Sequence, residues 1–517
     1  MATKLTNVGS GKIKDDSIIA FSYSEDATPL EPTSSSGGVS QVSLSAIEET
    51  ADADLVNTKL MINNSATIQD DEFGSVQFDV KKVFTNAAGI ANIIGDSVQT
   101  KLNVIKTAEG FVGTLTNAII YYCGLCGVTP VVDSALNAKS VVFIGWTGNV
   151  WEQLKDLCSV MSYSTTDKSP IEIYFTGTAV GFRPALASTI AIENYLSDVN
   201  ESVEIFDAAE SINVYSYNTA AKVNDILYDI SYYDSNSSNY AKRFLSSFSD
   251  SLQVGAGETK KVLFTIDTSL TSIKQPECVS TISPFPYDPL TSGNGQYVIV
   301  GTDDLPIQPS QWIDQGGSLT VRITENPNEI EITVVAPPET ALLKADGSGL
   351  GYAPYRIGKE TSGGGVDYDA IYIVGSGISY EKTKTTFYTG ANPSVTSKSE
   401  AFEVDNMFIT DDFTLANAGL SAAQASCGPL VTLNGSSASG FTFGSSIGSS
   451  FNFNSTRFRI DSVGFSQTGV SWNSQDCARF SDFNTTNTGK TFAQFDSKMT
   501  SSATFTDFSV IPLTIGV

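Results

Sequence analysis

The stretch GSLTVRITENPNEIEITVVAP, residues 317–337, indicates the fold class more clearly than any other part of the chain. Apolar and polar residues alternate on both sides of the turn sequence ENPN. The apolar positions before and after the turn are Leu319, Val321 and Ile323, then Ile330, Ile332 and Val334. Side chains that alternate with a period of two share one face of a strand. The pattern therefore predicts an antiparallel β-hairpin with one buried face.

Much of the remaining sequence favours sheets in the same way. Alternating stretches that predict further strands or hairpins are residues 17–24, 38–47, 74–84, 171–184 and 456–466. The chain contains 42 Gly, 29 Phe and 20 Tyr, and only 17% of its residues are charged. Such a composition suits sheets joined by turns better than long helices. We therefore predict a mainly β, multidomain protein built from small β-barrels or sandwiches.

One region departs from this pattern and predicts a small α/β insertion. Residues 114–127 form a predicted helix capped by Thr114. A second helix is predicted over residues 149–161, where Asn149 caps the first turn and Glu152 reaches back to the Asn149 amide. The apolar stripe of this helix is expected to face a sheet, with Leu154, Leu157, Cys158 and Met161 against residues 140–146 and 171–175.

The chain length of 517 residues lies well above that of one domain and predicts several. The predicted segments are an N-terminal β domain (1–110), the α/β insertion (111–184), a β domain (185–338), a β-rich domain with a helix at 418–428 (339–435) and a C-terminal β domain (436–517).

The charged and titratable residues exclude several classes of function. A nucleic-acid binder needs clustered Lys and Arg, but the net charge is −26 and no basic cluster occurs in the sequence. The chain contains no His, which removes Ser-His and Cys-His pairs and most common zinc or iron sites. We therefore expect no catalytic residue, no cofactor and no metal, and a structural rather than an enzymatic role.

The cysteines and apolar runs predict where the chain is made. Six Cys are too sparse for a disulfide scaffold. The first sixteen residues lack the apolar region of a secretory signal, and the longest apolar run, residues 118–128, is too short to cross a bilayer. We expect synthesis in a reducing cytoplasm and no membrane-spanning segment.

Two motif-like patterns have simpler interpretations than chemistry. NTTNTGKT, residues 484–491, resembles a phosphate-binding loop, but Asn484 stands where the motif needs its first Gly. Cys123-x-x-Cys126 could be a redox pair or half of a metal site, yet only Cys158 lies nearby in sequence. Cys123 also falls on the apolar helix face, where a thiol packs as a small hydrophobe. We predict a loop and core packing, respectively.

The glycine-rich and acidic patterns are predicted to be turns. DGSGLGYAP (346–354) and VGSG (374–377) lack the strand-turn-helix context of a dinucleotide fold. The acidic pairs are Asp70-Asp71, Asp303-Asp304 and Asp411-Asp412, and none completes a calcium-binding loop. A pair of glycosidase carboxylates remains open, because the separation of two such groups depends on the fold.

The end of the chain carries a repeat of paired phenylalanines. The pairs are Phe480 and Phe483, Phe492 and Phe495, and Phe505 and Phe508. Two Phe spaced by three residues can anchor a short loop on a neighbouring sheet. Their recurrence predicts a stacked set of loops that closes a β domain.

This ending resembles that of minor tail proteins from long-tailed phages of actinobacterial hosts. Gly489–Asp496 match one unit of a repeat found there, and Ile511-Pro512-Leu513 match the stop, while the first and third Phe copies match less well. The resemblance continues upstream, and it is the order of the segments that identifies the class. These segments are residues 146–158, 218–242, 297–334, 353–358 and 367–378.

The resemblance implies a structural virion protein at the distal tail tip, similar to the hub ring below the tail tube. Such hubs are built from small β-barrels with an α/β insertion and usually form trimers. The implied partners are further copies of the chain, a distal tail or tail-tube protein, the tape measure protein and other minor tail proteins. DNA would pass through the ring without tight binding. The family supplies no catalytic residues.

A carbohydrate-binding or cell-wall-degrading tail protein that contacts the host surface is the alternative. Sugar binding needs exposed aromatic side chains on one face. Trp146, Trp151, Trp312 and Trp472 are too scattered in sequence to indicate such a face. An assay on host cell walls would separate this alternative from the hub.

Overall fold

The computed structural model describes most of the chain. The described residues are 4–6, 18–27, 41–47, 65–85, 90–96, 99–133, 136, 139–164, 167, 169–176, 179–192, 195–204, 211–229, 252–266, 268–281, 294–357, 371–388, 402–426, 430–444 and 446–477. They form a mainly β structure, as the sequence predicts. The Phe repeats and the sequence NTTNTGKT lie outside these residues.

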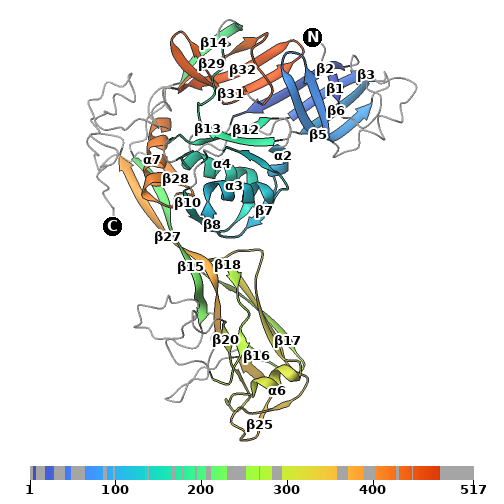
Figure 1. The fold of residues 1–517 in the computed structure, drawn as a ribbon, viewed down its shortest axis with the longest axis vertical. Coiled ribbons are helices and arrows are strands. Elements are labelled where there is room, and N and C mark those ends of the chain that lie inside the picture. The colour runs from blue at the N-terminus through green and yellow to red at the C-terminus, as the bar shows by residue number, and fades with distance from the viewer. Residues whose placement is uncertain are drawn as a thin grey trace.

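An 11-stranded sheet, here called the large sheet, forms the upper part of the molecule (Figure 1). Its strands come from both ends of the chain. In spatial order they are β1 (Lys4–Thr6), β4 (Ser65–Asp70), β5 (Gly74–Thr85), β6 (Ile90–Asp96), β3 (Gln41–Ile47), β2 (Ile18–Asp26), β31 (Thr456–Ser466), β32 (Gly469–Asp476), β29 (Leu430–Ser437) and β14 (Leu196–Glu204), with β30 (Ser450–Phe453) paired to β31. N-terminal β2 and C-terminal β31 join the two halves, with Tyr23 opposite Phe465.

The large sheet curls around an aromatic core. Residues 441–444 and 446–449, between β29 and β30, fold back into it, and we call them the core plug. The Phe443 ring of the plug packs on Phe465 with a centroid distance of 4.7 Å and on Tyr23 at 5.4 Å. Its amide donates to the Phe73 carbonyl, at the turn between β4 and β5. Alternating apolar residues in the strands supply the other half of this core.

An α/β module lies below the large sheet (Figure 1). Its helices are α2 (Gln99–Leu102), α3 (Leu115–Gly124), α4 (Val150–Val160) and α7 (Asp412–Ser426). Its strands are β7 (Ile105–Ala108), β8 (Phe111–Thr114), β9 (Pro130–Val132), β10 (Ser140–Phe143), β11 (Trp146–Asn149), β12 (Ile171–Thr176), β13 (Ala179–Pro184) and β28 (Phe402–Asp405). The strands form short sheets, and their apolar faces and the helices share one buried cluster.

The predicted helices of this module are confirmed. The Thr114 side chain caps α3 by accepting from the Asn117 amide, and Asn149 caps α4 by accepting from the Trp151 and Glu152 amides. The expected reach of Glu152 back to the Asn149 amide is replaced by an ion pair, since Glu152 contacts Lys155 one turn later at 2.8 Å. Capping by a side-chain oxygen satisfies amides that have no partner within the helix.

A two-stranded ribbon leads downward from the module. It consists of the 19-residue β15 (Ser211–Asp229) and the 18-residue β27 (Ile371–Tyr388), which pair antiparallel along most of their length. The pairing slips at two bulges, between Lys222 and Asp225 and between Ile226 and Tyr228. β28 pairs parallel to the upper part of β15 and joins the ribbon to the module.

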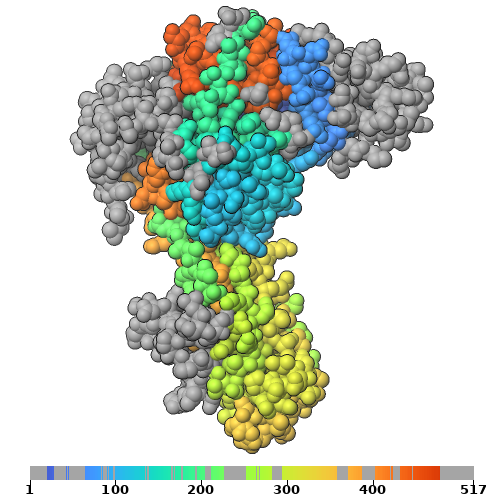
Figure 2. Space-filling view, in the orientation of Figure 1, coloured from blue at the N-terminus to red at the C-terminus, as the bar shows by residue number. Residues whose placement is uncertain are grey.

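The chain between the two ribbon strands forms a distal lobe with its own apolar core. Figure 2 shows the lobe as a projection below the module. Its elements are β16 (Leu252–Val254), β17 (Thr259–Thr265), β18 (Thr268–Ile273), β19 (Glu277–Cys278), β20 (Gln296–Tyr297), β21 (Ile299–Val300), α6 (Pro309–Asp314), β22 (Ser318–Ile323), β23 (Glu329–Val335), β24 (Ala341–Leu343), β25 (Leu350–Tyr352) and β26 (Tyr355–Ile357).

The hairpin predicted from ENPN is confirmed in its register. Leu319 lies opposite Val334, Val321 opposite Ile332 and Ile323 opposite Ile330. The turn itself packs on the module, because the Thr147 hydroxyl donates to the Glu325 carbonyl at 3.5 Å. A Cβ on Gly145 would lie 2.6 Å from Pro327, so glycine is required for this close approach. The turn therefore helps to seat the lobe on the module.

The division into five sequence segments stays a prediction. The described residues contain three large buried clusters, which belong to the large sheet, the module and the distal lobe. The first two each combine residues that are distant in the sequence. Two of them occupy the upper body, and the third fills the lobe inserted into the ribbon (Figure 1).

The substitution Leu154→Ala tests the packing of α4. Leu154 is fully buried, and α4 packs on β12, one of the two predicted neighbours, so the loss of Leu154 should leave a cavity. We expect the free energy of unfolding to be about 2–5 kcal/mol lower than that of the parent chain. The exposed Asn117→Ala on α3 is the matched control. Thermal unfolding curves of the three proteins would measure the difference, and equal midpoints for Leu154→Ala and the parent would contradict the packing.

Candidate functional site

The most elaborate group of charged side chains lies where the module meets the large sheet. Glu172 on β12 and Arg459 on β31 are each only 1% exposed, and their side chains are 2.9 Å apart. Arg183 on β13 donates its Nε–H to the other Glu172 oxygen at 2.8 Å. Arg459 also pairs with Asp461 at 2.9 Å. Two acids and two bases thus form a group without net charge, which we call the ion cluster.

The ion cluster connects three parts of the fold. Arg183 also donates to the Ile447 carbonyl in the core plug. The Glu172 carboxylate lies so close to Gly448 that a Cβ there would sit 1.9 Å from it. Gly448 has a φ of +72°, a conformation that glycine adopts without strain. Each charge has a bonded partner, so the cluster acts as a structural bridge and leaves no group free to move a proton.

The Cys-x-x-Cys motif is part of the module core, as the sequence predicts. Cys123 lies on the buried face of α3, and burial raises the pKa of its thiol to about 12. Burial also raises the pKa of Cys126, and it places that of Cys158 well above the ordinary value. A thiol reacts and binds metals as the thiolate. These three groups are therefore protonated at neutral pH and are poor nucleophiles.

The acidic pairs support turns and ion pairs. Asp70 accepts from the amides of Glu72 and Phe73 in the turn before β5. The remaining contacts pair Asp303 with Lys344, Asp304 with Arg356, and Asp411 with Lys139 and the Thr414 amide at the start of α7. Within the described part of the chain, no three His, Cys, Asp or Glu side chains gather as metal ligands.

The glycine patterns also serve the backbone. Residues 346–354 contain the turn between β24 and β25, where the Asp346 carboxylate accepts from the Ser348 amide. In VGSG, Gly375 and Gly377 lie inside β27 and allow β18 to approach, since a Cβ on Gly375 would be 2.2 Å from the Ser272 carbonyl. Neither pattern begins a helix, so neither provides amides for a phosphate.

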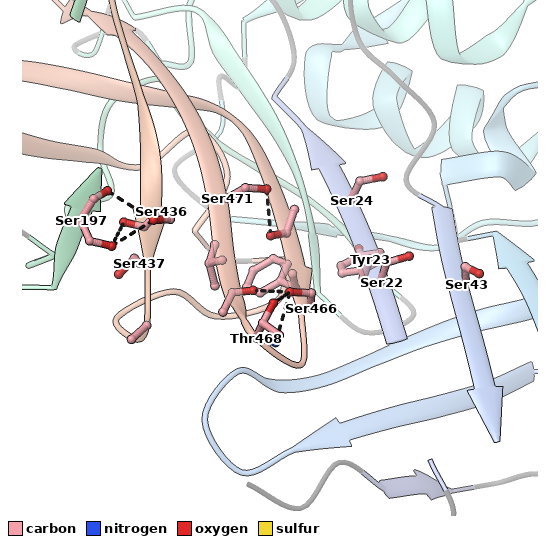
Figure 3. Close-up of a pocket in the computed structure, with 15 residues that line it drawn as sticks. Ser22, Tyr23, Ser24, Ser43, Ser197, Ser436, Ser437, Ser466, Thr468 and Ser471 are labelled. Carbon is pink, nitrogen blue, oxygen red and sulfur yellow. Dashed lines mark hydrogen bonds between the residues drawn. The ribbon is translucent and has the colours of Figure 1, made fainter. Parts of the chain in front are cut away.

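A cleft of about 480 Å³ opens on the outer face of the large sheet (Figure 3). Hydroxyl groups line it, among them Ser22, Ser24 and Ser43 on β2 and β3, whose side chains are exposed. Other hydroxyls are bound within the cleft. The Ser197 side chain contacts Ser436, Ser466 donates to the Gly469 carbonyl, and Ser471 donates to the Gly464 carbonyl. The sequence did not predict this cleft, because six strands from distant parts of the chain form it.

The cleft supports hydrogen bonding and no evident catalysis. A nucleophilic hydroxyl needs a neighbouring base. The lining residues are Ser, Thr, Gly, Ala, Val, Tyr and Phe, so none of them supplies an imidazole, an amine or a carboxylate.

The cleft belongs to a wider polar face that is nearly free of charge. Registered outward residues of neighbouring strands form rows: Ser43, Ser22 and Ser466; then Ser24, Gly464, Ser471, Ser436 and Ser197; then Asp26, Ser462, Asn473, Asn434 and Asn200. We call these rows the polar face. They contain no Lys or Arg, so they offer no cation to a phosphate or to an acidic partner.

The structure places the four tryptophans in cores. Trp146, Trp151, Trp312 and Trp472 are all 4% exposed or less. Rings that bind sugars by stacking must be exposed, so no Trp side chain is available for that purpose. Among the described helices, each is too short or too polar to cross a bilayer.

Comparison with known proteins gives matches only among solved structures. No protein-family model matches the sequence, and no curated protein matches it. The 43 kDa tail protein of prophage MuSo2 from Shewanella oneidensis is similar with a TM-score of 0.42 and 9% identity, over 92% of this chain and 98% of that one.

Two further tail proteins are similar to this chain to a comparable degree. A tail protein from Neisseria meningitidis MC58 has a TM-score of 0.39 and 7% identity, over 92% of this chain and 95% of that one. Prophage tail protein gp18 from Listeria monocytogenes EGD-e has a TM-score of 0.36 and 8% identity, over 92% and 94%. These values are below those that establish a shared fold.

The substitution Glu172→Gln tests the ion cluster. It leaves the buried Arg459 and the partly buried Arg183 with one carboxylate, and breaking a buried pair costs about 3–5 kcal/mol. We expect the denaturant concentration at the midpoint of unfolding to fall clearly. The fluorescence of the buried tryptophans reports the unfolding transition. Glu331→Gln, which breaks the exposed pair with Arg322, is the control and should change the midpoint much less. Equal effects of the two substitutions would show that the ion cluster does not hold the fold together.

Proposed function

We propose that the protein is a structural component of a phage tail tip, forming a hub ring below the tail tube through which the tape measure protein and DNA pass. The observation that carries the proposal is the ordered set of tail-protein-like segments along the chain. Residues 146–158, 218–242, 297–334, 353–358 and 367–378 carry it. The proposal extends to the actinobacterial host range and to contacts with distal tail and minor tail proteins.

A structural role agrees with the chemistry of the described residues. The charges of the ion cluster are paired, the buried thiols are protonated, and the hydroxyl cleft is lined by side chains that include no base. The buried tryptophans remove the observation that would have favoured the carbohydrate-binding alternative.

The open edges of the large sheet support assembly of several copies. Among the described strands, β14 pairs only with β29 and β1 pairs only with β4, so each leaves one side of its backbone unpaired. β14 is nine residues long, and Val203 on it is 52% exposed. Unpaired edges promote pairing with another chain unless they are covered. Head-to-tail contacts between such edges close into rings, and we propose a trimer.

The polar face supports passage of DNA without adhesion. Tight binding of DNA requires Lys and Arg to replace the counterions of the phosphates. The rows of the polar face offer hydroxyl and amide groups, and their one ionisable side chain is the acid Asp26. Together with the net charge of −26, this favours a surface that DNA can contact without binding tightly.

The mass of the assembled protein tests the proposed trimer. We expect native mass spectrometry of hubs released from virions, or of the concentrated chain, to give three copies, because one chain leaves its sheet edges uncovered. Replacing the exposed Val203 on β14 by Pro removes a backbone donor and adds a clash at the edge, so the assembly should weaken. Val203→Thr, which keeps the backbone donor at the same exposed position, is the control. A monomer within virions would refute the trimer.

The interaction with DNA is tested by electrophoretic mobility at physiological salt. We expect no binding by the isolated protein, because acidic groups repel phosphate within a Debye length of roughly 8 Å. The triple change Ser24→Lys, Asn434→Lys and Ser471→Lys on the polar face should create binding that weakens with added salt. Tight binding by the unchanged protein, or a basic lumen in a map of the assembled ring, would contradict the proposal.

A further inference from the structure

Glu25 is an acid at a core position of the large sheet. It follows Phe21 and Tyr23 on the inward face of β2, and only 2% of it is exposed. Its Oε1 accepts a hydrogen bond of 2.7 Å from the amide of Gly444, 419 residues away in the chain. Its Oε2 is buried and has no hydrogen-bond partner among the described residues. A carboxylate needs more partners than this to remain charged in an apolar core.

Gly444 lies in the middle of the core plug, so Glu25 contacts the segment that fills the large sheet. Phe443, beside it, donates its amide to Phe73. At the other end of the plug, Gly448 donates its amide to the Ile460 carbonyl and touches the ion cluster. The plug is therefore held at one end by paired charges, and near its middle by the bond of Gly444 to an acid and the bond of Phe443 to Phe73.

The elements around Glu25 supply no cation to stabilise its charge. The described residues of the core plug are Phe, Thr, Gly, Ser and Ile, and β3 carries no ionisable side chain. On β31, Arg459 is engaged by Glu172 and Asp461, and Arg457 donates to the Ser450 hydroxyl and the Leu186 carbonyl.

The remaining neighbours are acidic or neutral. On β2, Asp26 points to the opposite, exposed face. At the turn between β4 and β5, the Asp70 carboxylate is bound to the Glu72 and Phe73 amides, and Asp71 is exposed. Tyr23 and the Gly444 amide are the groups that favour the ionised form of Glu25.

We propose that Glu25 is a proton-controlled latch, which holds the core plug on β2 while it is neutral and loosens the plug when it loses its proton. The bond to Gly444 and the unpartnered Oε2 make the neutral form the one that fits this position. The latch concerns the local stability of the large sheet and does not depend on the proposed role in a tail.

The pH range follows from the direction of the pKa shift. Burial raises the pKa of Glu25 from 4.5 to about 7, and Tyr23 and the Gly444 amide offset only part of this rise. Opening the plug exposes the carboxyl to water and returns its pKa toward the ordinary value. A raised folded-state pKa means that the stabilisation is complete below the ordinary pKa and is lost as the pH rises through 7. Opening should therefore become easier from acidic to mildly basic pH.

Hydrogen exchange of the plug tests the latch in the purified full-length protein. Exchange is measured by mass spectrometry for a peptide covering residues 441–449, with the parent chain and Glu25→Gln compared at the same pH so that intrinsic rates cancel. We expect exchange in the parent to approach that of Glu25→Gln at pH 5 and to be at least about tenfold faster at pH 8, the factor for one pKa unit. Glu201→Gln, at an exposed position on the edge strand β14, is the matched control and should exchange like the parent at both values.

Each result decides the proposal. A ratio between the parent and Glu25→Gln that stays the same from pH 5 to pH 8 overturns it, as does slower exchange in the parent at pH 8. If Glu25→Gln does not fold, the parent provides its own comparison through the hairpin of residues 318–335 in the distal lobe. Protection of the plug must then fall relative to protection of that hairpin as the pH rises, and an unchanged ratio overturns the latch.

Discussion

The ion pair between Glu172 and Arg459 is the constraint on which the upper body depends. Removing both charges from water is costly, and their mutual contact and the further bonds to Arg183 and Asp461 offset that cost. Because the partners sit on β12 and β31, the module and the large sheet cannot separate without exposing an unpaired buried charge. The same geometry forces glycine at 448 and thereby sets the path of the core plug.

The core plug unites the two ends of the chain around one apolar core. Phe443 contacts rings contributed by β2 and β31 and the turn before β5, so N-terminal and C-terminal strands cooperate in burying it. Two acids border this segment in opposite states. Glu172 is surrounded by guanidinium groups, whereas Glu25 has Tyr23 and the Gly444 amide beside it, and its Oε2 has no hydrogen-bond partner among the described residues. The charge of Glu172 stabilises the fold, and Glu25 makes the position of the core plug depend on a proton.

The arrangement of the molecule agrees with an assembly protein. The distal lobe is inserted between the two strands of the ribbon and is seated on the module through its ENPN turn. This leaves the polar face and the open edges of the large sheet at the other end of the molecule (Figure 1).

The sequence by itself determined the local structure, and only the tertiary structure decided how distant segments meet. Alternation around ENPN predicted the register of β22 and β23, Asn149 predicted the start of α4, and the apolar position of Cys123 predicted a buried thiol. These features follow from spacing along a few residues, where the period of a strand or helix and the bonding of a cap are set by neighbouring side chains. The lack of His likewise limits the chemistry that any fold of this chain could perform. By contrast, Glu172 and Arg459 are 287 residues apart, and Glu25 and Gly444 are 419 apart, so neither pair leaves a local pattern. In β2, Glu25 stands at a position where the alternation of apolar residues predicts another apolar side chain. The hydroxyl cleft depends in the same way on the registers of strands from both ends of the chain. Periodicity shows which face of a strand is buried, but the partner across that face is chosen by packing and charge compensation in three dimensions.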